Sequence, residues 1–217
     1  MSMIRRSFSL RGLALITAIS MAWVTSGCGN IFTPKHKVTV DAICAAGVPK
    51  PAGQSFRLVA KRSNLGLGQV NIGVLSACVS AALAHAGMYE APVAVAPDLV
   101  IEVSCGQESG TRADPGSRET YLDLSARPNT AKAMQRTADP EIWNVRVSIQ
   151  GLSGRIETSM PLLAAVAASY TAADTRFQTQ IEVPQNDASI TAVREAALKT
   201  LEAKATPATA EAPPQSK

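Results

Sequence analysis

Three segments in which apolar and polar residues alternate follow one another at 98–105, 121–126 and 143–149. The last segment is headed by Trp143, the largest apolar side chain in this part of the sequence. Alternation of this kind is typical of strands that bury one face. Because polar loops of about a dozen residues join the segments, the pattern predicts an antiparallel meander with Trp143 in the core.

Further strands and a first helix are predicted on either side of this meander. Segments 38–41, 54–61 and 177–183 also alternate, and the last of them predicts an edge strand. The stretch 70–86 contains no proline and has apolar residues at helical spacing, which predicts a helix. Gly87 follows it, where a glycine commonly ends a helix.

Two more helices complete the predicted order of elements. Ser159 is a candidate N-cap for a helix over 162–170, and Asp187 or Ser189 for a last helix that reaches Leu201. The order is strand, strand, helix, three strands, helix, strand, helix. It predicts an α+β fold, with a mostly antiparallel sheet and helices packed on one face.

The first 27 residues have the pattern of a signal peptide. Residues 1–11 contain three arginines and no acidic residue, and an apolar run follows at 13–24. That run fits a signal-peptide core and is too short to cross a bilayer, which takes about 20 apolar residues. An arginine pair in the basic segment leaves open whether export uses the general or the twin-arginine route.

The sequence Thr25-Ser26-Gly27-Cys28 resembles the lipobox of bacterial lipoproteins. In that family the signal is cut before the cysteine, whose thiol then carries diacylglycerol. The residue three before the cysteine is usually a larger aliphatic one, and Thr25 stands there instead. The resemblance implies lipidation of Cys28, and two or more acyl chains anchor a protein stably. The alternative is a plain signal peptide cut nearby, which leaves Cys28 free.

We therefore expect a signal peptide at 1–27, a lipidated tether at 28–37, one domain at 38–202 and a disordered tail at 203–217. Gly29 is not the aspartate that retains lipoproteins in the inner membrane of enteric bacteria. The resemblance thus favours the outer membrane, facing the periplasm. The chain has 21 basic and 17 acidic residues, and loss of the three arginines of the signal peptide leaves 18 against 17. That balance gives no electrostatic footprint for nucleic acid.

Motifs for catalysis, metals or cofactors are not found. His36 is interpreted as a solvated tether residue, and His85 as a last-turn residue that complements the helix dipole. Gly66 and Gly68 precede a helix, but their spacing fits a flexible turn better than a phosphate-binding loop. We assign no catalytic, cofactor or metal residues.

Charged residues of the predicted strands share an outward face. Glu102 and Asp123 are expected there together with Arg57 and Arg146, and we interpret them as solvated cross-strand charge pairs. The alternative is an acid–base site, for which Glu102, Asp123 and His85 would have to converge in one cleft.

Three cysteines besides Cys28 lie in the predicted domain: Cys44, Cys78 and Cys105. In an oxidising periplasm two of them can form a disulfide, and the odd total leaves one unpaired. Cys78 and Cys105 fall on apolar faces, so two buried free thiols are an equal alternative.

Three segments resemble a family of bacterial lipoproteins catalogued as domain of unknown function 4136. They are APDLVI at 96–101, EIWNVRV at 141–147 and MPLLAA at 160–165. The resemblance extends over residues 38–200, and its motifs are structural. It implies a lipid-anchored, periplasm-facing α+β domain without an assigned activity.

These observations favour a non-enzymatic binding or assembly module of the cell envelope. The expected partners are the membrane, through the lipid anchor, and an envelope protein or lipid. The alternatives are an accessory lipoprotein of a lipid or solute transporter and an envelope hydrolase. An apolar groove or exposed apolar patch would be the mark of a binding module.

Replacement of Cys28 by alanine is expected to release the protein from the membrane fraction and to abolish incorporation of labelled palmitate. The physical reason is that the acyl chains supply the membrane affinity, about 0.8 kcal/mol for each buried methylene group. Cell fractionation and metabolic labelling measure both effects. Labelling that persists in the Cys28→Ala variant would contradict lipidation at this residue.

Overall fold

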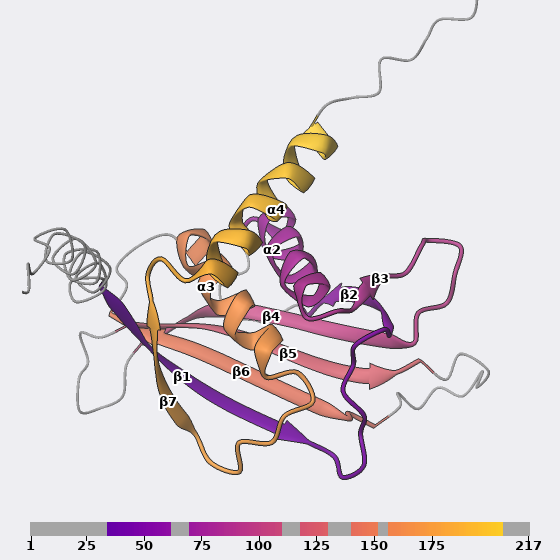
Figure 1. The fold of residues 1–217 in the computed structure, drawn as a ribbon, viewed down its shortest axis with the longest axis horizontal. Coiled ribbons are helices and arrows are strands. Elements are labelled where there is room, and N and C mark those ends of the chain that lie inside the picture. The colour runs from indigo at the N-terminus through magenta and orange to yellow at the C-terminus, as the bar shows by residue number, and fades with distance from the viewer. Residues whose placement is uncertain (1–33, 62–69, 110–117, 130–139, 152–155, 206–217) are drawn as a thin grey trace, which may run out of the picture. The chain divides into compact units, whose positions relative to one another are not determined.

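The computed structural model describes residues 34–61, 70–109, 118–129, 140–151 and 156–205 (Figure 1). The described residues from Lys35 onward belong to one compact unit. The predicted signal peptide, Cys28, the Gly66–Gly68 turn and the tail after Ala205 lie outside the described residues.

Seven strands and three helices are formed by the described residues. The strands are β1 (Lys35–Cys44), β2 (Ser55–Ala60), β3 (Tyr89–Glu90), β4 (Leu99–Ser109), β5 (Arg118–Pro128), β6 (Trp143–Gln150) and β7 (Thr179–Pro184). The helices are α2 (Ile72–His85), α3 (Ile156–Ser169) and α4 (Ala188–Ala205). The strands form one sheet in the order β3-β2-β4-β5-β6-β1-β7.

The sheet is mixed but mostly antiparallel, which confirms the predicted α+β class. Strand β2 is parallel to β3 and β4, and the remaining pairs are antiparallel. The meander β4-β5-β6 and the edge position of β7 are as predicted. Strand β3 was not predicted because two residues are too few to show alternation.

The strand register places the core on one face of the sheet, which we call the buried face. Val103 lies opposite Leu124, Leu124 opposite Val145, and Val145 opposite Ala42. All four are buried, and Trp143 is only 2% exposed, as predicted. Because successive side chains of a strand point to opposite faces, the residues between these form a second face, which we call the polar face.

The helices close the core through small side chains. Helix α3 contacts β5 and β6, and α2 contacts both α3 and α4. Ala82 of α2 and Ala164 and Ala167 of α3 are buried. Alanine at such positions lets helices approach closely, toward the lower end of the usual 8–10 Å interaxial distance.

Helix α2 has a defined cap at each end. At its start, the side chain of Asn71 accepts hydrogen bonds from the backbone N–H groups of the first turn. At its end, Gly87 adopts a φ of +89°, which confirms the predicted glycine stop. The N–H of Gly87 donates to Ala84, and that of Met88 donates to Leu83, so four residues form a Schellman motif.

The predicted boundaries differ from the observed ones at three places. Helix α3 begins at Ile156, so Ser159 lies in its first turn and the predicted N-cap is wrong. Helix α4 continues to Ala205, past Leu201, although Asp187 precedes its first residue as predicted. Residues 35–37 belong to β1, because they pair with β7 instead of forming a tether.

The Gly87→Ala variant is expected to lower the free energy of unfolding by about 1–2 kcal/mol, because a side chain is strained in the left-handed conformation. The Gly87→Asn variant should lose less, since asparagine tolerates this conformation better. Urea denaturation of the two variants measures the difference. Equal stability of wild type and Gly87→Ala would contradict the assignment of this glycine as a helix stop.

Candidate functional site

A cavity of about 420 Å³ lies between the three helices and β7. We call it the helix cavity. Its apolar lining includes Ala82 and Ala86 of α2, Ala165 and Val166 of α3, Val183 of β7 and Val193 of α4. A cavity of this size is within the range of small-molecule sites, which are mostly apolar with a few polar groups.

The polar groups of the helix cavity are held by neighbours on their own elements. The Ser169 hydroxyl donates to the carbonyl oxygen of Val166 at 2.7 Å. Asp187 Oδ1 accepts from the N–H of Ser189 at 2.8 Å and from its hydroxyl. These bonds lower the pKa of Asp187, because they stabilise its ionised form. His85 contributes from the last turn of α2, its predicted place.

The polar face of the sheet carries a compact cluster around Tyr121. A Cβ atom added to Gly106 would lie 2.9 Å from the Tyr121 hydroxyl, so the ring lies against the glycine backbone. The Arg146 guanidinium lies 4.3 Å from the ring centroid. Its Nη2 donates to both carboxylate oxygens of Glu108, each at 3.1 Å. The glycine, ring and ion pair together form a packed surface on the exposed side of β4, β5 and β6.

Asp123 lies next to this cluster and has an unusual protonation equilibrium. Burial raises the pKa of Asp123, and the hydrogen bond from Asn144 Nδ2 at 2.9 Å opposes that rise. Nearby, the hydroxyl of Ser125 donates to the carboxylate of Glu141. The cluster is therefore a network of satisfied polar groups.

The predicted sharing of one face by Glu102 and Asp123 is confirmed by the register, in which Glu102 lies opposite Ser125 and Asp123 opposite Ser104. Their predicted ion pairs are wrong. Arg127 lies 3.9 Å from Glu102, and Arg146 binds Glu108.

Arg57 also takes a different partner from the one predicted. Its Nη2 donates to the carbonyl oxygens of Pro92, Val93 and Val95 in the loop after β3. The charge thus holds a loop, because several carbonyl oxygens outcompete one exposed carboxylate.

The acid–base alternative receives no support from the arrangement of its three residues. His85 lines the helix cavity, whose described lining contains neither Glu102 nor Asp123. Among the described residues, no group of three or more His, Cys, Asp or Glu side chains is placed to hold a metal ion. Within the same residues, no helix is long and apolar enough to span a membrane.

The three cysteines of the described residues are free thiols. Cys78 and Cys105 are buried, and Cys44 is half-buried. Burial raises the pKa of Cys78 and that of Cys105 to about 11. Both thiols therefore stay protonated near neutral pH, which makes them poor nucleophiles.

A second cavity, of about 170 Å³, contains His36 and was not anticipated. We call it the His36 pocket. His36 was predicted to be a solvated tether residue, but it lies in β1 opposite Val183 and is half-buried. The helix cavity was also not located by sequence, although the many alanines of 77–86 and 164–168 were a signal of close helix packing.

No protein-family model and no curated protein matches the chain. Among solved structures, it is similar to the PelC dodecamer from Paraburkholderia phytofirmans, with 12% identity, coverage of 64% of this chain and 99% of that chain, and a TM-score of 0.40. A variant of that protein gives 12%, 63%, 98% and 0.40. A PDZ domain protein from Parabacteroides distasonis gives 11%, 78%, 42% and 0.49. TM-scores this low carry no argument about function.

The Asp123→Asn and Asp187→Asn variants are expected to respond to pH in opposite directions. The unfolded pKa of aspartate is about 3.9. Because the folded pKa of Asp123 is raised, its ionisation above that value destabilises the folded state. Because the folded pKa of Asp187 is lowered, its ionised form contributes stability that is lost as pH falls.

Relative to wild type, Asp123→Asn should therefore gain free energy of unfolding between about pH 3 and about pH 7, whereas Asp187→Asn should lose it. Urea denaturation at both values measures the two differences. A shift of both variants in the same direction would contradict the opposite environments assigned to these carboxylates.

Proposed function

We propose that this protein is a lipid-anchored, periplasm-facing binding module of the cell envelope and not an enzyme. The observation that carries the proposal is the helix cavity, an apolar space of about 420 Å³ between α2, α3 and α4. The lipobox-like sequence that ends at Cys28 supports the anchor, and the outer membrane is the proposed location. The resemblance to domain of unknown function 4136 is part of the same proposal.

We also infer that the three helices cover one face of the sheet. Helix α3 contacts β5 and β6, α2 contacts β2 and β3, and α4 contacts both other helices; Figure 1 allows the reader to follow these elements. In this arrangement the helix cavity opens away from the polar face. The two surfaces would then be available to different partners.

The chemistry of the helix cavity favours binding over catalysis. Its walls are alanine and valine side chains, and the hydroxyl of Ser169 and the carboxylate of Asp187 already have partners. A ligand would gain mainly from burial of apolar surface, about 25 cal/mol per Å². An apolar group of an envelope lipid or protein fits such a site. A role as transporter accessory differs only in the identity of that partner.

An Ala165→Phe substitution tests this site. Ala165 is half-buried and lines the cavity, so a benzyl group there should occupy part of the space and weaken binding several-fold. Fluorescence titration with the apolar probe N-phenyl-1-naphthylamine measures the effect. Ala84→Phe is the matched control, because Ala84 is an exposed alanine of α2 outside the cavity lining.

The proposal predicts weaker probe binding for Ala165→Phe and unchanged binding for Ala84→Phe. Equal binding by the two variants, or no binding by wild type, would overturn the assignment of the helix cavity. Thermal unfolding of both variants shows whether a loss arises from the cavity or from unfolding.

A further inference from the structure

The His36 pocket differs in chemistry from the helix cavity. Its lining is His36 of β1, Thr158, Ser159 and Leu162 of α3, Gln185, and Ile190 and Arg194 of α4. This lining contains hydroxyl, amide, imidazole and guanidinium groups but no carboxylate. Hydrogen-bond donors and a fixed positive charge without a negative counterpart select an anion.

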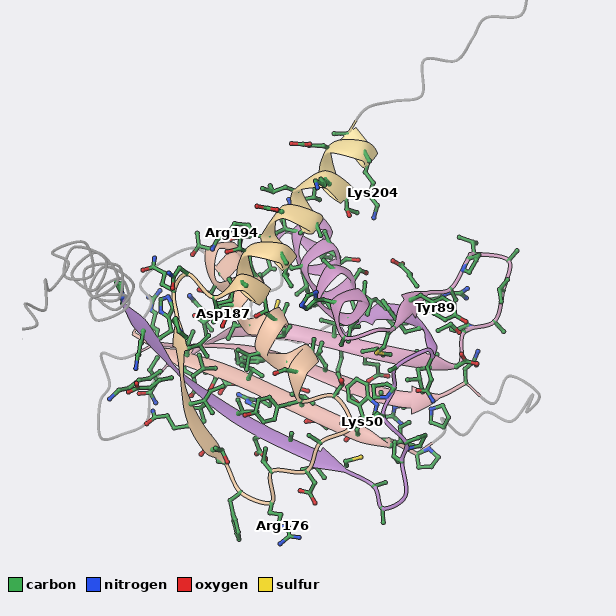
Figure 2. All side chains as sticks on the ribbon, in the orientation of Figure 1. Lys50, Tyr89, Arg176, Asp187, Arg194 and Lys204 are labelled. Carbon is green, nitrogen blue, oxygen red and sulfur yellow. The ribbon has the colours of Figure 1, made fainter. Side chains whose placement is uncertain are left out.

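Arg194 supplies the charge. It forms no ion pair with a carboxylate of the described part of the chain. Figure 2 shows Arg194 on α4, beyond Asp187 and next to the first turn of α3. A guanidinium group presents several N–H donors in one plane, a geometry that matches two oxygens of a phosphate group.

Ser159 gives an independent indication that a ligand belongs in this pocket. Its side chain is 4% exposed and lines the pocket. Its hydroxyl has no hydrogen-bond partner among the residues that the structure describes. A buried hydroxyl without a partner costs about 1–3 kcal/mol, so an oxygen-rich ligand that accepts this bond would recover the cost.

The backbone and the remaining side chains add to the same preference. Thr158 and Ser159 lie in the first turn of α3, where the helix dipole places partial positive charge. The imidazole of His36 can donate a hydrogen bond in either protonation state, and so can the amide of Gln185. A volume of about 170 Å³ accommodates a phosphate group with a short substituent and excludes a larger headgroup.

From these contacts we propose that the His36 pocket binds a phosphate group, held by Arg194 and by the hydroxyl of Ser159. Phosphate can come from a phospholipid headgroup or from a free phosphate compound. The lipid source rests on the proposed anchor. His36 follows Cys28 by eight residues, which span at most about 29 Å when extended, so an acylated Cys28 would keep the pocket close to the headgroups.

The test uses the full chain with Cys28→Ala, so that binding to vesicles cannot come from an acyl anchor. Calorimetric titration with inorganic phosphate and with glycerol 3-phosphate measures binding of the free group. Sedimentation with phosphatidylglycerol vesicles measures binding of the lipid headgroup, and vesicles of a neutral galactolipid provide the phosphate-free comparison. Palmitate labelling of the wild-type chain is measured separately.

Two variants and one control complete the design. Arg194→Gln and Ser159→Ala should each weaken binding, by at least about tenfold for the charge. Lys199→Gln removes an exposed positive charge from the same helix outside the pocket and should change binding by less than about twofold. Arg194 is exposed, so its variant should unfold at the wild-type temperature.

The outcomes separate the pocket from the anchor. Phosphate binding that Arg194→Gln weakens and Lys199→Gln does not supports the proposal, and its appearance with phosphatidylglycerol vesicles or only with the solutes identifies the source. No binding of any phosphate probe, or equal loss in Arg194→Gln and Lys199→Gln, overturns it. Absence of palmitate labelling with phosphate binding intact would overturn the anchor alone.

Discussion

The insertion of β1 between β6 and β7 is the interaction on which the rest of the structure depends. Val38, Val40 and Ala42 of this strand are fully buried, and they pair with strands more than a hundred residues later. A strand from the beginning of the domain thereby becomes internal to the sheet. Such non-local pairing forms late, because the loop that it closes costs entropy before any contact repays it.

Both cavities follow from this insertion. Pairing with β1 holds β7 in the sheet and so places Val183 at the helix cavity, while β1 itself brings His36 to the second pocket. Thr175 reinforces the arrangement, since its hydroxyl accepts from the backbone N–H of Ala42 at 3.0 Å. The connection between α3 and β7 is thus fixed to the same strand, and the cavity walls gain a rigid base.

The sequence was sufficient for those features that depend on local patterning. Alternation located the meander, and Gly87 and Asp187 marked helix ends, because the responsible contacts lie within a few residues. The misassigned residues depend on distant partners. The composition around His36 resembles a tether, but pairing with β7 overrides local composition. The cavities depend on how closely three helices approach, which no single segment encodes.

Helix α4 links the two cavities through neighbouring residues. Val193 faces the helix cavity and Arg194 faces the His36 pocket, while Ile190, Val193 and Ala197 are the residues of α4 that are buried. Three buried side chains on a helix of 18 residues give a modest hydrophobic attachment. A ligand in either cavity would bind only the docked helix and would stabilise it by mass action. Occupation of one cavity would therefore favour binding at the other, even without a contact between the two ligands.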